Sequence, residues 1–339
     1  MTAAAAERPL TDRVGIVLLG LWLVWVVGSS VAHGARFDDA LPYLTAPTFL
    51  ALGLWAGHRL QRSSIPDLFP PFLLLVSVYV LFSVTLMGGA GGGPLGYSNA
   101  NAALGIQLTA VAGITALHTS GQRRTGCLWA AAFFALSVPW TLSQAGIALL
   151  LPFAGVLLLA LRRPDKRRLW MLPLAAVAVL TAAVTVVQIT RLTAWPEAFK
   201  IMFSGARRGL WSEAIALWSR NFYLGAGPGG FAATTSLATD SDTQRVHMSV
   251  LQVASELGLI GLALFGALIL ITYIKLLSAP PAPRLIATAA LSALLIHSFV
   301  DHLLEFPGVL LATGTAIGLS TSYDSSPRPD QQRFAPSDG

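Results

Sequence analysis

The sequence predicts an all-α fold of the polytopic membrane class, a bundle of about ten transmembrane helices with one large extracytoplasmic loop. Composition is the first reason, because 54% of the 339 residues are hydrophobic and 11% are charged, whereas a soluble domain has about 25% charged residues. The mean hydropathy is +0.66. The other two reasons are the recurrence of apolar segments of helical length and the placement of basic residues between them. So few polar groups can face water that lipid has to surround most of the chain.

A membrane helix needs about 20 mostly apolar residues. We take each apolar segment of about this length as a predicted span. The first, Val14–Ala32, exceeds the roughly 7–15 residues of a signal-peptide core, so we expect a retained helix. The fifth, sixth and tenth are short, which gives a count of about nine or ten spans. The spans are 14–32, 41–57, 68–87, 99–118, 126–141, 145–161, 169–190, 249–277, 285–303 and 306–321.

Basic residues are concentrated in alternate breaks between these spans. Most of the 22 Lys and Arg residues lie on one side, and the short breaks on the other side contain only Arg36. Cytoplasmic loops carry such an excess of basic residues, so both termini are expected in the cytoplasm. The net charge of +6 is spread over these breaks instead of forming one basic surface. Topology and contact with membrane lipids therefore explain it, and no nucleic-acid partner is expected.

This topology divides the chain into four regions. Residues 1–190 hold the first seven transmembrane helices, and residues 249–321 hold the last three. Between them, residues 191–248 form a long extracytoplasmic loop with an amphipathic helix, where function is expected to concentrate. Residues 322–339 contain too few apolar side chains to fold and are expected to be a disordered cytoplasmic tail.

The long loop contains two distinctive patterns. Apolar side chains repeat at helical spacing after Arg207 and Arg208, which predicts an amphipathic helix on the bilayer surface or on the bundle. Such a helix either anchors to lipid headgroups or offers its arginines to an anionic ligand. The Gly- and Pro-rich segment Leu224–Phe231 follows, and it either turns the chain or binds an anion with its backbone N–H groups. The apolar face of the helix comprises Trp211, Ile215, Trp218 and Phe222.

Titratable side chains gather at the outer ends of the eighth and ninth spans. His247 opens the eighth span, where a histidine is either an interfacial residue or a general base. On a continuous helix Glu256 would lie about 180° from His247 and two to three turns into the bilayer, so it needs a partner or a wet cavity and does not pair directly with His247. Asp301, His302 and Glu305 end the ninth span on the same outer side. Because the chain has one cysteine, no intramolecular disulfide is expected. Because it has no metal-binding or hydrolase motif, no metal site is predicted.

The run from residue 205 to 261 resembles the O-antigen ligase and O-antigen polymerase family of bacterial envelope membrane proteins. The order and spacing agree over about 57 residues, and two further segments, Tyr97–Ala102 and Leu142–Gly146, resemble the family's Asn-x-Asn and Ser-Arg-Gly helix openings. The chain has Gln144 where the family has an Arg that holds a phosphate, and Met248 where it has Asn. The matching residues are Arg208, Trp211, Gly225, Gly227, Gly229, Phe231, His247, Leu251, Gln252 and Glu256 to Gly261.

The resemblance implies a C-type glycosyltransferase architecture in the bacterial inner membrane. Such enzymes take a glycan from an undecaprenyl-diphosphate carrier at the extracytoplasmic face and move it to a lipid or glycan acceptor. They need no cofactor, no metal and no nucleotide sugar. His247 would be the catalytic base. The substrate-binding residues would be Arg208, Arg207, Trp211, Gln144, Asn101, Asp301 and His302.

Two other classes of protein fit parts of the sequence. A transporter or flippase for a lipid-linked or small solute would explain the many helices and Glu256 without catalysis. Transporters usually have broken helices and polar residues near the midplane, whereas the polar groups here gather at one face. A structural envelope component is the third class. The motifs are shared by ligases and polymerases, so the sequence does not separate these two or name the sugar.

Overall fold

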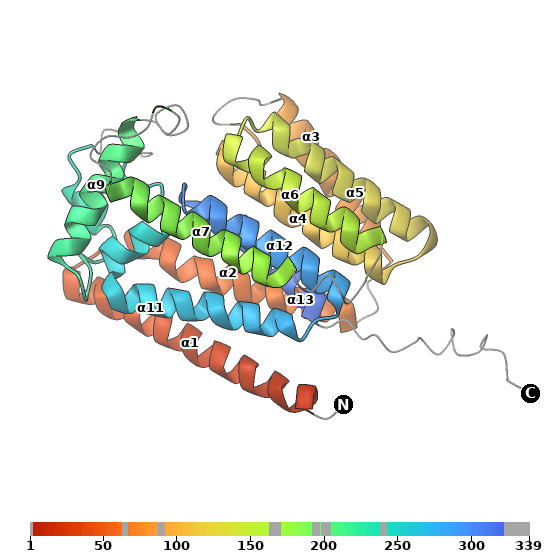
Figure 1. The fold of residues 1–339 in the computed structure, drawn as a ribbon, viewed down its shortest axis with the longest axis horizontal. Helices are drawn as coiled ribbons and strands as arrows, with labels where there is room; N and C mark the ends of the chain where they lie inside the picture. The colour runs from red at the N-terminus through yellow and green to blue at the C-terminus, as the bar shows by residue number, and fades with distance from the viewer. Residues whose placement is uncertain are drawn as a thin grey trace, which may run out of the picture.

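The computed structural model describes residues 3–62, 67–86, 92–162, 171–191, 197, 205–237 and 243–321. These residues form helices connected by short turns, and this part of the chain has no strand (Figure 1). The predicted tail, 322–339, lies outside the described residues. The helices are α1 (Ala3–His33), α2 (Phe37–Arg62), α3 (Phe69–Leu86), α4 (Ser98–His118), α5 (Gly121–Trp140), α6 (Gln144–Arg162), α7 (Met171–Arg191), α9 (Gly205–Arg220), α10 (Gly230–Thr234), α11 (Ser249–Leu277), α12 (Pro281–Ser298), the 3₁₀ helix η2 (Leu303–Glu305) and α13 (Pro307–Thr321).

Each predicted span coincides with a helix, and within the described residues five helices are long and apolar enough to cross a membrane. In four of them the apolar side chains are largely exposed, as at Ile16, Leu75 and Leu151, which is the arrangement expected when lipid replaces water. The fifth, Ser98–His118, is mostly buried among the other helices. The chain is therefore a multi-pass membrane protein, while the count of about ten spans stays a prediction. The five are Leu10–His33, Phe69–Leu86, Ser98–His118, Gln144–Arg162 and Ser249–Leu277.

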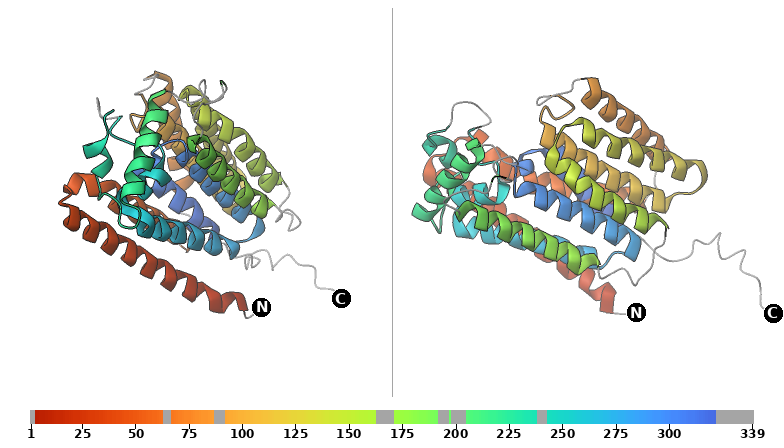
Figure 2. Two further views of the ribbon diagram at one scale, coloured as in Figure 1. Left: turned by 60° about the vertical axis from the view of Figure 1, so that its left-hand side comes forward. Right: turned by 45° about the horizontal axis from the view of Figure 1, so that its top comes forward.

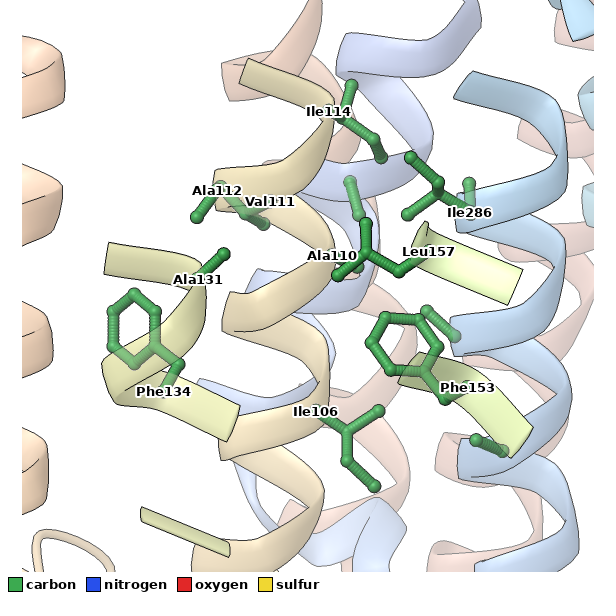
Figure 3. Close-up of a cluster of buried hydrophobic side chains, with 14 of the residues drawn as sticks. Ile106, Ala110, Val111, Ala112, Ile114, Ala131, Phe134, Phe153, Leu157 and Ile286 are labelled. Atoms are coloured by element: carbon green, nitrogen blue, oxygen red, sulfur yellow. The ribbon is translucent and has the colours of Figure 1, made fainter. Parts of the chain in front are cut away.

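Helix α4 forms the centre of the bundle, because almost all of its side chains are buried. Ile106 and Ile114 of α4 pack among Phe134 of α5, Phe153 of α6 and Ile286 of α12 (Figure 3). Glycines bring another helix pair closer still. In α2 and α13, a methyl group added at Gly53 or at Gly314 would lie 2.1 Å from a backbone oxygen of the other helix. Only glycine permits this approach of two backbones.

Helices α9 and α10 lie together at one end of the bundle, beside the start of α11 (Figures 1 and 2). The buried face of α9 consists of Leu210, Trp211, Ala214 and Leu217. The predicted amphipathic helix is therefore present and packs on the bundle, but its buried face is rotated from the predicted one. Phe222, which the sequence analysis placed on that face, lies beyond the helix end and is exposed.

The eighth predicted span is broken in its N-terminal part, contrary to the continuous helix assumed from the sequence. Gly258 has φ 67° and ψ −168°, which is not helical. The chain around Phe222 inserts at this break: the amide of Leu259 donates to the carbonyl of Phe222 at 2.9 Å, and that of Ala226 donates to the carbonyl of Ser255 at 3.0 Å. A broken helix thus does not distinguish a transporter from an enzyme in this protein.

Candidate functional site

Asp301 is the centre of a buried polar cluster just beyond the C-terminal end of α12. Helix α12 ends at Ser298, earlier than the predicted span, so Asp301 lies in the turn before η2. Its side chain is fully buried. The oxygen Oδ1 faces two imidazoles, with Nδ1 of His302 at 2.8 Å and Nδ1 of His247 at 3.3 Å. The oxygen Oδ2 accepts from the hydroxyl of Tyr97 at 2.8 Å, from the amide of Asn99, and from Nη2 of Arg207 at 3.4 Å.

His247 is held in this cluster by its backbone as well as by its ring. Its φ is 54°, a left-handed conformation that costs a residue other than glycine on the order of 1–3 kcal/mol. Two neighbouring interactions support this conformation. The indole Nε1 of Trp211 donates to the carbonyl of His247 at 3.4 Å, and Ser249 donates its amide and its hydroxyl to the carbonyl of Asp301 at 3.1 and 3.0 Å. Such strain is typical of functional sites.

The two arginines at the start of α9 are in different surroundings. Arg207 is half-buried and pairs with Asp301, whereas Arg208 is exposed. A third arginine, Arg245, makes an ion pair with Glu305 in which Nε and Oε2 are 3.1 Å apart. The structure therefore brings Arg207, and not Arg208, into contact with the predicted carboxylate, and Trp211 lies beneath His247 in the buried core.

Of the two asparagines at the start of α4, the one that reaches the cluster is Asn99. Its side-chain oxygen accepts from the hydroxyl of Ser143 at 2.5 Å, and its amide donates to Asp301. Asn101, the predicted binding residue, is buried and bonds to the preceding loop, where it accepts from the amide of Leu95 at 3.0 Å. Gln144 is exposed at the first residue of α6. The structure thus brings Asn99 to Asp301, with Ser143 bonded to Asn99, in place of Asn101 and Gln144.

Sequence reasoning missed three residues of the cluster: Tyr97, Asn99 and Ser143. All three lie inside the two helix openings that the resemblance had pointed to, so a signal was present. The motif does not tell which polar side chain of each opening turns inward. That choice depends on where the helix starts, and the extended backbone of Tyr97 before α4 sets it.

The electrostatics of the cluster favour a negative Asp301. Burial alone would raise its pKa, but the contacts with His247 and His302 and the charge of Arg207 outweigh burial and hold the pKa well below its usual range. Burial, together with the adjacent Asp301 carboxylate, raises the pKa of the Tyr97 phenol, which stays protonated and donates. Burial also raises the pKa of Glu305, against the opposing effect of Arg245. The site therefore holds one ionised carboxylate surrounded by donors.

The same cluster has the donor set of a metal site. Ligand atoms of His247, Asp301 and His302 all lie within 4.8 Å of one another, and imidazole with carboxylate suits Zn²⁺ and similar ions. No metal-binding motif predicted this set, because His247 and Asp301 are far apart in the chain, although both were expected on the same side of the bundle. In the described structure both imidazoles already face Asp301, so the geometry also serves hydrogen bonding without an ion.

Glu256 belongs to a separate buried cluster. It accepts from the hydroxyl of Tyr43 at 2.6 Å and from the amides of Gly229 and Phe231 at 3.0 and 3.2 Å. These bonds fix the Gly-rich turn against the broken end of α11, and Gly225 at φ 76° has no room for a side chain beside the carbonyl of Glu256. Glu256 thus has the partner that the sequence analysis required, and that partner is not His247.

Comparison with known proteins matches part of the chain to one family. Residues 129–266 match the family model described as O-antigen ligase, which confirms the resemblance read from the motifs. No curated protein matches the chain. The matched stretch includes Ser143, Arg207 and His247 of the Asp301 cluster, together with Glu256. Over these residues the chain is therefore similar to an O-antigen ligase, a family of glycosyl-transfer enzymes.

Proposed function

We propose that this protein, which belongs to the O-antigen ligase family through residues 129–266, transfers a glycan from an undecaprenyl-diphosphate carrier to a lipid or glycan acceptor. The reaction takes place at the extracytoplasmic face of the bacterial inner membrane. One observation carries the proposal: a buried Asp301 gathers His247, Arg207 and Asn99 from three different parts of the chain. A base held by a carboxylate beside a cation is what transfer from a diphosphate leaving group requires.

In the proposed step, His247 is the general base. Its Nδ1–H donates to Asp301, which leaves Nε2 as the nitrogen that takes the proton of the acceptor hydroxyl. The acceptor oxygen forms a bond to the anomeric carbon while the bond from that carbon to the diphosphate oxygen breaks. The diphosphate leaves with the electron pair, and the anomeric configuration inverts in this single displacement. Asp301 then stabilises the imidazolium.

Arginines hold the leaving group in this proposal. Arg208 binds the carrier diphosphate, because a guanidinium donates two parallel hydrogen bonds to a phosphate and keeps its charge at any working pH. Arg207 supports it from its place beside Asp301. Trp211 acts by positioning His247 from below. Gln144 and Asn101 stand at the starts of the helices that carry Ser143 and Asn99, and Gln144 replaces the family's phosphate-binding Arg with a neutral donor.

The proposed topology places both termini in the cytoplasm and the loop 191–248 outside. In support, α1 begins and α13 ends at the end of the bundle that lies away from α9 (Figure 1). A reporter fused after Arg168 is expected to read cytoplasmic, and one fused at Thr239 extracytoplasmic; both positions lie outside the described residues. The same reading from both fusions contradicts this topology and the placement of the site.

Transfer by the purified protein tests the function. The protein in nanodiscs is mixed with a lipid-linked glycan donor and an acceptor, and product is followed by mass spectrometry. We expect product without a nucleotide sugar, and we expect EDTA to leave the rate unchanged. Donor that crosses the membrane of a proteoliposome without forming product would instead favour the transporter alternative. A rate that falls with EDTA and returns with Zn²⁺ would contradict metal independence and point to His247, Asp301 and His302 as ligands.

A further inference from the structure

His247, Asp301 and His302 have the spacing of a zinc site as well as its donor atoms. Their ligand atoms lie within 4.8 Å of one another, and all three residues are buried. In a tetrahedral Zn²⁺ site, bonds of about 2.0–2.2 Å place two ligand atoms roughly 3.4 Å apart. The two Nδ1 atoms already lie 2.8 and 3.3 Å from Oδ1 of Asp301. Small rotations of the two rings therefore bring the set to the geometry that Zn²⁺ needs.

The surroundings of Oδ1 of Asp301 favour one cation over two separate N–H donors. A carboxylate oxygen has about two lone-pair sites. The backbone amide of His302 donates to Oδ1 at 2.8 Å, so the Nδ1 atoms of His247 and His302 share the other site. A Zn²⁺ ion uses that lone pair once and binds both nitrogens. Imidazole with carboxylate suits Zn²⁺, whereas Mg²⁺ prefers oxygen ligands.

A small ion can reach this set, and the neighbouring charges make its binding reversible. His302 lines a cavity of about 870 Å³ including its open side. Arg207 pairs with Asp301, and Arg245 pairs with Glu305, which lines the same cavity. These two pairs already balance both carboxylates, so a cation is not needed to neutralise them. We therefore expect Zn²⁺ to bind when it is added and to leave when a chelator removes it.

Binding through Nδ1 changes the tautomer of His247. In the proposed reaction, Nδ1–H donates to Asp301 and Nε2 takes the proton of the acceptor hydroxyl. When Zn²⁺ occupies Nδ1, the neutral imidazole keeps its one proton on Nε2. That nitrogen can then donate a hydrogen bond but cannot accept a proton. The ion also takes the oxygen of Asp301 that orients the ring.

We propose that Zn²⁺ binds to His247, Asp301 and His302 and thereby inhibits glycan transfer. The inhibition rests on the proposed function, because it requires His247 to be the base, while the binding itself does not. The enzyme works without the ion, and removal of the ion restores turnover. The same three residues thus serve the reaction when they hold protons and stop it when they hold zinc.

His297 supplies a matched control for the ligand set. It is a buried histidine in the last turn of α12, shortly before His302 in the chain, and it is not one of the three ligands. Replacing either histidine by glutamine removes one buried imidazole from the same region. His302→Gln removes a ligand, whereas His297→Gln does not. Each variant is compared with its own rate in the absence of zinc.

Two measurements on purified protein in nanodiscs test the inference. Binding is followed by the visible absorption of Co²⁺ and its displacement by Zn²⁺, and we expect one ion per chain in wild type and in His297→Gln. His302→Gln should bind at least about tenfold more weakly, because even residues that support a metal ligand contribute about 10- to 100-fold. The zinc concentration that halves the transfer rate should rise by the same factor, and Mg²⁺ should not inhibit. X-ray absorption at the zinc edge of the wild-type protein should show two imidazoles, which tests the ligands even if a variant does not fold.

Other outcomes overturn the inference. Absence of a bound ion, or equal weakening in His297→Gln, removes the three residues as ligands. Equal inhibition by Mg²⁺, or inhibition unchanged in His302→Gln, places the ion on the donor diphosphate. A rate that falls with EDTA alone makes the ion part of the catalyst. Zinc bound by this set without any glycan transfer keeps the metal site and removes the proposed function, whereas transfer that continues with zinc bound keeps the transfer activity and removes the inhibition.

Discussion

Asp301 and Glu256 are both almost completely buried carboxylates of this protein, but they bind different kinds of groups. Glu256 accepts from two backbone amides and one tyrosine hydroxyl, none of which can take up or release a proton at a useful pH. Asp301 faces two imidazoles and a guanidinium in addition to neutral donors. Burial of a carboxylate therefore does not by itself identify the functional site. Asp301 differs from Glu256 because its neighbours can exchange protons and bind anions.

The comparison also separates two kinds of consequence for mutation. Removing Glu256 should loosen the turn that fills the break in α11, and thus lower stability. Removing members of the Asp301 cluster should change the reaction. The experiments below are ordered from the largest expected effect on glycan transfer to the smallest.

Arg208→Ala is expected to abolish transfer, because the leaving diphosphate loses its principal cation. Arg208→Lys should retain little activity, since an ammonium replaces a two-pronged donor by a point charge. Arg207→Ala should be milder, because Arg207 pairs with Asp301 and only supports Arg208 in holding the diphosphate. Complementation of a strain that lacks the gene measures all three, with protein level checked by immunoblot. Normal complementation by Arg208→Ala would remove Arg208 from the site.

Asp301→Asn is expected to lower turnover by about 10²- to 10⁴-fold, the range of an acid–base contribution. The amide keeps the shape of the side chain but loses the charge that orients His247 and stabilises its protonated form. Turnover of purified protein in nanodiscs is the measurement. A variant that binds donor normally and turns over at the wild-type rate would show that Asp301 has only a structural role.

The low pKa of Asp301 in the folded protein also predicts a pH dependence of stability. Its pKa is held well below the usual range in the folded protein, so the folded state binds fewer protons there than the unfolded state. The stabilisation is present above the unfolded pKa of about 3.9 and is lost as pH falls towards the folded pKa. The difference in melting temperature between wild type and Asp301→Asn should shrink as pH falls below about 4. A difference that is unchanged between about pH 5 and pH 3 contradicts this.

Glu256→Gln is expected to have the smallest effect on transfer per folded molecule. The amide weakens the bonds from Tyr43, Gly229 and Phe231, which should cost about 1–3 kcal/mol of stability. Thermal unfolding in detergent and turnover normalised to folded protein separate the two effects. If turnover falls as far as in Asp301→Asn while the melting temperature is unchanged, the division between the two carboxylates is wrong.

The helices of this fold could be predicted, because apolar runs and alternating basic breaks follow directly from the cost of exposing polar groups to lipid. The break at Gly258 could not be predicted, because hydropathy reports the polarity of side chains and does not show that another segment interrupts the helix backbone. The same holds for the site. His247 and Asp301 were expected near each other from their places at neighbouring helix ends, whereas Asn99 in place of Asn101 depends on the phase of α4. The left-handed φ of His247 could not be predicted either, because nothing about histidine as a residue type indicates it.

The most direct test of the central claim, that His247 oriented by Asp301 is the base, is the turnover of His247→Gln with purified lipid-linked donor. Glutamine keeps a hydrogen bond to Asp301 but cannot accept a proton. We predict that His247→Gln and His247→Ala lose activity equally, by about 10²- to 10⁴-fold, without a fall in protein level. Transfer by His247→Gln at the wild-type rate would contradict the account and reduce His247 to an interfacial residue.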